Sequence, residues 1–167
     1  MPASHPDHVD ELIGQWSAVR PDLGSQLPAM ATFGRLARLT RLSGRSIEGV
    51  FARHGLSSGE FDVLAAIRRS GEPYTLMPSE LTRTMMLSPA GTTNPLDRLE
   101  ALGHITRQHD PDDRRSTLVV LTAAGLTVVD RAVAEHVANE AQLLDVLTVS
   151  ERAAFDRALR KLVGQFD

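Results

Sequence analysis

The sequence predicts a mainly α-helical protein with one small β-hairpin, and three observations support this fold class. Apolar residues recur at helical spacing over most of the 167 residues. Two short helical segments follow one another with only Leu87 and Ser88 between them. Beyond Gly103 the pattern changes to two strand-like segments, residues 105–108 and 117–121, on either side of a charged turn. A helix-turn-helix followed directly by such a hairpin is the winged-helix arrangement.

Two helices are predicted near the N-terminus. A short amphipathic helix covers about residues 9–19 and ends before Pro21, because its apolar residues fall on one stripe. A long helix runs over about residues 28–53 and is closed by Gly55. Three glycines interrupt the long helix, at Gly34, Gly44 and Gly49. Each costs about 1 kcal/mol relative to alanine in an exposed helix, so we expect packing against another helix or another subunit to stabilise it.

Three shorter elements precede the turn of the helix-turn-helix. Ser57 or Ser58 caps a third helix, which stops at Gly71. Residues 74–77 are short and β-prone, and a fourth helix covers about residues 78–86.

The fifth helix is the candidate recognition helix. Ser88 and Pro89 suit its N-cap and first position, and Gly103 suits its end. Three of its residues are expected to face inward, namely Leu96, Leu99 and Leu102. At 100° per residue the opposite face carries Ala90, Thr93, Asn94, Asp97 and Ala101, with Arg98 beside them. Thr93 and Asn94 can hydrogen-bond base edges or phosphates, and the alternative is an ordinary solvated face.

Pro95 conflicts with a straight recognition helix. It removes the hydrogen bond to the Gly91 carbonyl, and proline costs about 3 kcal/mol in a helix interior. We therefore expect this helix to be kinked, to be shortened, or to begin later. Alternatively, Gly91 and Pro95 define a bent entry that changes which DNA sequence is read.

The hairpin turn carries two adjacent arginines, Arg114 and Arg115, after Asp112 and Asp113. They suit contacts with the minor groove and phosphates, and Asp112 or Asp113 is expected to pair with one arginine and hold the tip. The alternative is an ordinary charged turn. Residues 78–116 hold five Arg and six acidic residues, so this is no basic block and a modest salt dependence is expected.

Composition excludes several classes of protein. There is no Cys, which excludes disulfides, thiolate metal sites and thiol-based sensing. No apolar run approaches the roughly 20 residues of a membrane span, and the first residues do not have the pattern of a secretory signal, so a cytoplasmic protein is expected. Glycine-rich phosphate loops and nucleophile elbows are missing, so no enzyme and no cofactor is predicted. His5, His8, Asp7 and Asp10 have a weak metal-like spacing, but a flexible terminus explains them better and no metal is predicted.

The sequence also resembles the MarR family of bacterial transcription factors, from Leu36 to Phe166. The similar segments are residues 61–64, 79–81, 88–93, 97–103, 110–115 and 121–125, of which the hairpin signature is the most specific. The resemblance implies a winged helix-turn-helix with interlocking N- and C-terminal dimerisation helices. The family usually has Arg where this chain has Pro95. The candidate DNA contacts are Ser88, Ala90, Thr92, Thr93, Asn94, Arg98, Arg114 and Arg115.

One branch of the family, which responds to urate, is similar in having an N-terminal helix with a Trp and an Asp before the helix-turn-helix. Trp16 and Asp62 match these positions. Pro95 stands where the branch has an arginine, so an anionic ligand would lack that cation, and another aromatic or carboxylated metabolite fits as well as urate. Four arginines at helical spacing on the long helix could replace the cation, namely Arg35, Arg38, Arg41 and Arg45. Trp16, Asp62 and Arg38 are the ligand-binding candidates. The alternatives are helix packing for Trp16, capping or ion pairing for Asp62, and a solvated face for the arginines.

The C-terminal part is predicted to form two helices, one from Thr122 to about Leu147 and one opened by a capping box at Thr148 and Glu151. The last helix carries an apolar stripe of Phe155, Leu159, Leu162, Val163 and Phe166. Because the stripes of the first, second and last helices have no partner in a lone winged helix, a two-fold dimer is expected. Residues 1–55 and 122–167 would form the dimerisation region, and residues 56–121 the DNA-binding domain.

These inferences predict a homodimeric DNA-binding transcriptional regulator, a repressor that a small aromatic or anionic ligand releases from a palindromic operator. The alternative is a winged-helix module that binds proteins and has little or no specific affinity for DNA.

Overall fold

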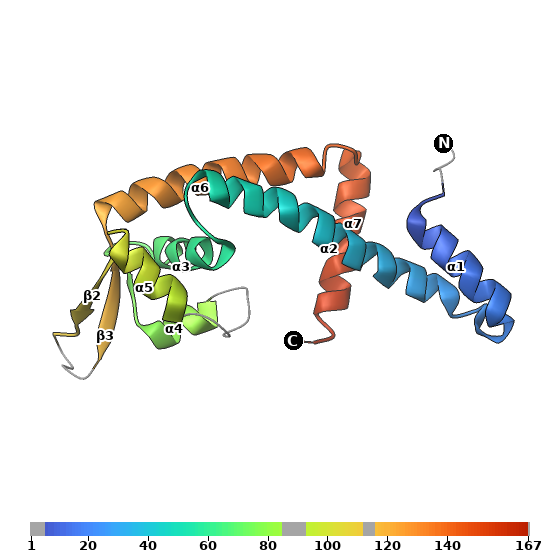
Figure 1. Cartoon of the computed structure of the whole chain (residues 1–167), viewed down its shortest axis with the longest axis horizontal. Helices are drawn as coiled ribbons and strands as arrows, with labels where there is room; N and C mark the ends of the chain where they lie inside the picture. Colours follow the sequence, from blue (N-terminus) through green and yellow to red (C-terminus); the bar gives the residue numbers. More distant parts are fainter. Residues whose placement is uncertain (1–5, 85–92, 112–115, 167) are drawn as a thin grey trace. The chain divides into compact units, whose positions relative to one another are not determined.

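The computed structural model describes residues 6–84, 93–111 and 116–166, and the chain divides into two compact units, residues 1–46 and 47–167. Figure 1 shows its elements in chain order. They are α1 (His8–Val19), the 3-10 turn η1 (Pro21–Leu23), α2 (Leu27–Arg53), α3 (Ser58–Arg69), β1 (Thr75–Leu76), α4 (Pro78–Thr84), α5 (Thr93–Ala101), β2 (Ile105–His109), β3 (Thr117–Leu121), α6 (Ala123–Leu143) and α7 (Val149–Val163). The predicted fold class, mainly helical with a small hairpin, is confirmed.

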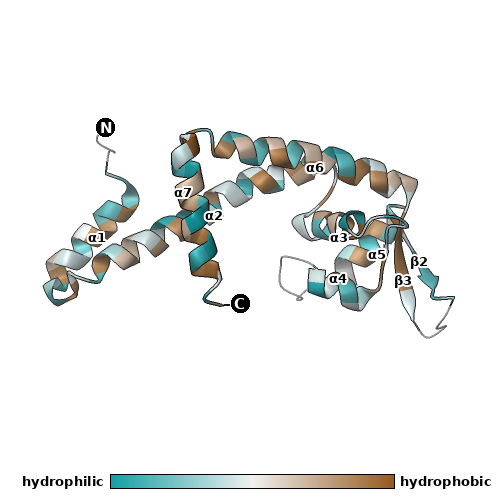
Figure 2. Ribbon diagram, turned by 180° about the vertical axis from the view of Figure 1, so that it is seen from behind, coloured by the Kyte–Doolittle hydropathy of each residue, from teal (hydrophilic) through white to brown (hydrophobic). Residues whose placement is uncertain are grey.

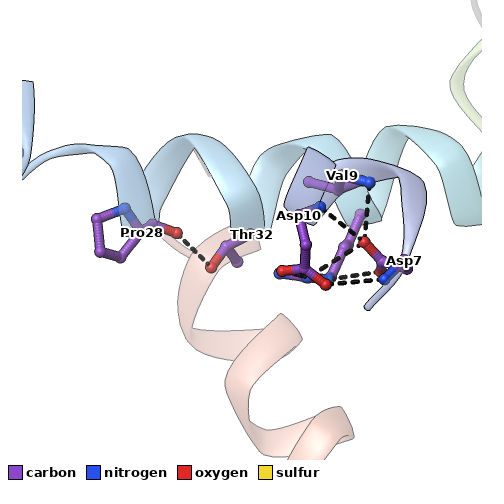
Figure 3. Close-up of polar contacts among 6 residues, drawn as sticks. Asp7, Val9, Asp10, Pro28 and Thr32 are labelled. Carbon is purple, nitrogen blue, oxygen red and sulfur yellow. Dashed lines mark hydrogen bonds and ion pairs between the residues drawn. The ribbon is translucent and has the colours of Figure 1, made fainter. Parts of the chain in front are cut away.

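In the first unit α1 packs against α2. The Asp7 side chain accepts hydrogen bonds from the backbone N–H groups of Val9 and Asp10, which caps α1 (Figure 3). Val9 is buried, and a Cβ on Gly34 would lie 3.3 Å from its Cγ1. Gly34 therefore lowers the helix propensity of α2 but allows α1 to approach closely. Arg35 pairs with Asp7 at 2.9 Å and with Asp10 at 2.6 Å, and this pairing lowers the pKa of the Asp7 carboxyl.

Helix α3 lies at the centre of the second unit. A capping box opens it, since Ser57 accepts from the Glu60 N–H and Glu60 accepts from the Ser57 N–H. Its apolar residues are buried and contact α4, α5, α6 and β3. Phe61 stacks on Phe51 of α2 with ring centroids 4.0 Å apart. This core is the platform on which the helix-turn-helix rests.

The three strands form one antiparallel sheet in the order β1-β3-β2. Ile105 pairs with Leu121, and His109 pairs with Thr117 at the far end of the hairpin. Val119 and Leu121 point into the core, whereas most of β2 is exposed. The predicted wing is therefore present, and residues 112–115 of its turn lie outside the described residues.

Two predictions about helix ends are wrong. Leu102, expected to face inward, is 48% exposed, because α5 ends at Ala101 and Gly103, at φ 72°, turns the chain away. Helix α6 ends at Leu143 rather than near Leu147. The chain there forms a turn in which the Leu147 N–H donates to the Leu144 carbonyl, and Thr148 then caps α7 with the predicted capping box.

Several apolar side chains remain exposed on α6, on α7 and after them, and Figure 2 shows brown residues on both helices. Val146, Val149 and Phe166 are each at least 87% exposed. Among the helices of the described chain, none has the length and apolar character that spanning a membrane requires.

Candidate nucleic-acid interface

Helix α5 presents the face that its periodicity predicts. Leu96 and Leu99 are buried in the core, while Asp97, Arg98 and Ala101 are exposed. Thr93 and Asn94 lie in the first turn of α5. The helix therefore has an inner apolar side and an outer polar side, as a helix in the major groove requires.

Pro95 is the third residue of the described part of α5, which covers Thr93–Ala101. The ring lies close to α3, since a Cβ on Gly59 would be 3.4 Å from Pro95 Cγ. The predicted start at Ser88 and Pro89 lies outside the described residues, so the kink, the shortening, the late start and the bent entry expected for Pro95 stay predictions.

Ion pairs connect α5 to elements on two sides. On one side Arg98 Nε lies 2.9 Å from Glu60 Oε1 of α3. On the other side Arg107 of β2 bonds Asp97 at 2.6 Å and Glu100 at 3.1 Å. The Arg107 backbone N–H also donates to Glu100 at 3.1 Å. The recognition helix is thus tied to both the central helix and the wing.

Five of the candidate DNA contacts lie outside the described residues, namely Ser88, Ala90, Thr92, Arg114 and Arg115. Their roles, and those of Thr93 and Asn94, stay predictions. Arg98 is described, and it has a protein partner in Glu60. Sequence reasoning missed Glu60 and Arg107. The capping box at Ser57 and Glu60 was a visible signal for the first, whereas nothing in the sequence marked the second.

The first unit holds a pocket that contains two of the predicted ligand-binding residues. Trp16 of α1 and Arg38 of α2 line a cavity of about 380 Å³ together with Arg41. Its other lining residues are mainly apolar, among them Leu12, Ile13 and Met30. A pocket lined by an indole ring, two arginines and several apolar side chains suits an aromatic anion.

Asp62 lines a different pocket, in the second unit, of about 630 Å³. Its Oδ2 is buried and has no hydrogen-bond partner within the described chain. Burial raises the pKa of the Asp62 carboxyl, against the opposing effects of Arg69 and His136. Within the described residues Asp62 therefore has neither the capping role nor the close ion pair of the alternative interpretation, and a carboxylate with a desolvated oxygen and a raised pKa is typical of functional sites.

We expect Asp62→Asn to stabilise the protein at neutral pH. Because the folded pKa is raised, the ionised carboxylate destabilises the fold above the unfolded pKa, and this effect is absent below it. The substitution should raise the melting temperature at pH 7 by about 1–2 °C, because solvent partly screens the half-buried carboxylate. The gain should vanish as the pH falls through the pKa of Asp62. Thermal unfolding measured between pH 3 and 8 tests this, and a gain that does not change with pH would contradict it.

Comparison with known proteins gives the same class as the geometry. The model of the MarR family matches residues 54–116, which contain α3, the helix-turn-helix and most of the wing. The transcriptional regulator PecS of Dickeya dadantii is 36% identical over 159 residues, which cover 95% of this chain and 92% of PecS.

Two solved structures are similar over most of the chain. One is the structure of BpsR of Bordetella bronchiseptica, whose DNA binding is regulated by 6-hydroxynicotinic acid. BpsR has 26% identity to this chain and a TM-score of 0.62, and the similarity covers 76% of this chain and 91% of the BpsR chain. The other is a mutant MarR of Escherichia coli in complex with operator DNA, with 23% identity and a TM-score of 0.66. The similarity covers 88% of this chain and 96% of the MarR chain.

Helix α5, the wing and the core on which they rest define a winged helix-turn-helix fold. The family match and the 36% identical relative make the protein a DNA-binding regulator of transcription. The chain belongs to the MarR family. It is a regulator and not an enzyme, as predicted.

Proposed function

We propose that the protein is a homodimeric repressor that binds a palindromic operator and is released by a small aromatic anion. The observation that carries the ligand part of this proposal is the pocket in which Trp16, Arg38 and Arg41 lie together. The regulation of BpsR by 6-hydroxynicotinic acid, an aromatic acid, supports the same class of ligand.

The dimer is supported by the apolar side chains that the single chain leaves exposed. Phe33 and Leu39 of α2 and Val163 of α7 are each more than half exposed. Exposed apolar surface of this kind marks an interaction site. A second copy buries these side chains with a single two-fold operation and places two recognition helices about one turn of DNA apart.

The test measures binding to labelled duplexes tiled across the DNA upstream of the gene, in about 100 mM salt with nonspecific competitor. We expect tight binding to one palindromic fragment, and release by urate, salicylate or 6-hydroxynicotinic acid. Sedimentation of the same sample should show a dimer. A stable monomer at micromolar concentration contradicts the dimer, and failure on every fragment favours the protein-binding alternative.

Replacing Arg38 by Gln tests the pocket. The variant should bind the operator fragment normally but need about tenfold more of the active acid for release, because it loses a charged hydrogen bond to the carboxylate. Arg45→Gln is the matched control, since Arg45 is exposed on the same helix and does not line the pocket. Equal sensitivity of both variants would place the ligand elsewhere.

A further inference from the structure

Glu60 combines charge and burial in an unusual way. Among the side chains that the structure describes, Glu60 alone is both charged and buried, and its side chain is 3% exposed. Burial of a carboxylate is costly unless the charge is paired and hydrogen-bonded. Both of its oxygen atoms have partners. Oε2 accepts from the Ser57 N–H at 2.7 Å, and Oε1 lies 2.9 Å from Arg98 Nε.

The cap of α3 by itself does not require a charge at this position. Glutamine completes a capping box as well as glutamate does. The same box recurs at Thr148 and Glu151 of α7, where the glutamate is exposed. The charge of Glu60 is therefore explained by its other partner, Arg98.

Arg98 lies on α5, and its side chain is 62% exposed although its Nε is ion-paired with Glu60 at 2.9 Å. A guanidinium has five N–H donors, and the ion pair with Glu60 engages its Nε side. A free arginine loses considerable rotamer entropy when it binds a ligand. A buried carboxylate that already holds Nε removes part of this cost before DNA arrives.

We propose that Glu60 is a positioning residue for DNA recognition: it holds the guanidinium of Arg98 so that the remaining N–H donors meet DNA in a fixed orientation. The contact also fixes the angle of α5 on α3, next to the place where Pro95 meets Gly59. The inference rests on α5 being the helix that contacts DNA. It extends that function by assigning part of the specificity to a residue that does not touch DNA.

The test compares wild type, Glu60→Gln, Arg98→Gln and the double variant, as full-length proteins. Affinity is measured by fluorescence anisotropy for the duplex that the wild type selects from a random pool and for an unrelated duplex. Glu60→Gln should weaken binding to the selected duplex about tenfold and to the unrelated duplex by less than about twofold. Arg98→Gln should weaken specific binding at least as much, and the double variant should be no weaker than Arg98→Gln.

Glu151→Gln is the matched control, because it makes the same chemical change in the capping box of α7. It should leave both affinities unchanged. The NMR signal of Arg98 Nε–H supplies a second readout. It should exchange slowly in the wild type and rapidly in Glu60→Gln.

The outcomes distinguish failure of the positioning role of Glu60 from failure of DNA recognition by α5. Unchanged specific binding of Glu60→Gln, or reductions in affinity that multiply in the double variant, would overturn the positioning role. Rapid exchange of Arg98 Nε–H in the wild type would overturn it as well. If the wild type selects no duplex, DNA recognition by α5 itself is wrong.

Discussion

Replacing Gly125 by Ala is expected to destabilise the protein by about 3 kcal/mol, the upper end of the usual cost of overpacking. Gly125 is buried in the first turn of α6, where its N–H donates to the Thr122 side chain. A Cβ there would overlap the carbonyl oxygen of His104 and lie 2.9 Å from Leu121 Cδ1.

The carbonyl of His104 cannot easily move away. It accepts hydrogen bonds from the N–H of Thr122 at 3.0 Å and from its Oγ1 at 3.1 Å. These bonds join the segment between α5 and β2 to the start of α6. The methyl group of alanine would therefore push apart the two segments that hold the wing against the core.

Urea unfolding of Gly125→Ala and wild type at equal protein concentration measures this effect. Gly14→Ala is the control, because Gly14 is exposed in α1 and a Cβ there meets nothing within 4 Å. The control should be more stable than wild type by about 0.5–1 kcal/mol, from helix propensity alone. If Gly125→Ala unfolds at the wild-type midpoint, the close approach to His104 is wrong.

The second large effect is expected for DNA binding when Arg114 and Arg115 are both replaced by Ala. Strands β2 and β3 pair from Ile105 to His109, so the chain that joins them is the turn of the wing. Arginines at a wing tip suit the minor groove and the phosphates. An arginine of this kind contributes about 1–3 kcal/mol to binding. The double variant should therefore bind the operator fragment at least about 30-fold more weakly.

The salt dependence distinguishes a direct role in DNA binding from a general unfolding of the protein. The slope of log K against log salt should become shallower by about one for each phosphate that the variant no longer neutralises. Arg157→Ala with Arg160→Ala is the control, since it removes the same charge from exposed positions of α7. Unchanged affinity and slope in the wing variant would support the alternative that this winged helix binds proteins.

Local patterns in the sequence predicted the elements well. The strands predicted at residues 105–108 and 117–121 are observed at 105–109 and 117–121, and Thr122 and Thr148 cap α6 and α7 as predicted. Each of these signals is contained in a few consecutive residues, because capping and strand alternation depend on neighbours within one or two turns. The error at Leu102 arose where Gly103 competed with helical periodicity, whereas α6 ends at Leu143 with no glycine or proline to mark the end.

The amino-acid sequence by itself determined the class of fold, the family and the order of the helix-turn-helix and the wing. Only the tertiary structure decided which charges meet. Glu60 and Arg98 are 38 positions apart, and Arg38 joins Trp16 in one pocket from another helix. Such contacts depend on how helices pack, which spacing along one helix does not encode. Tertiary packing therefore made Arg98 a paired side chain, and the same packing brings His104 against Gly125.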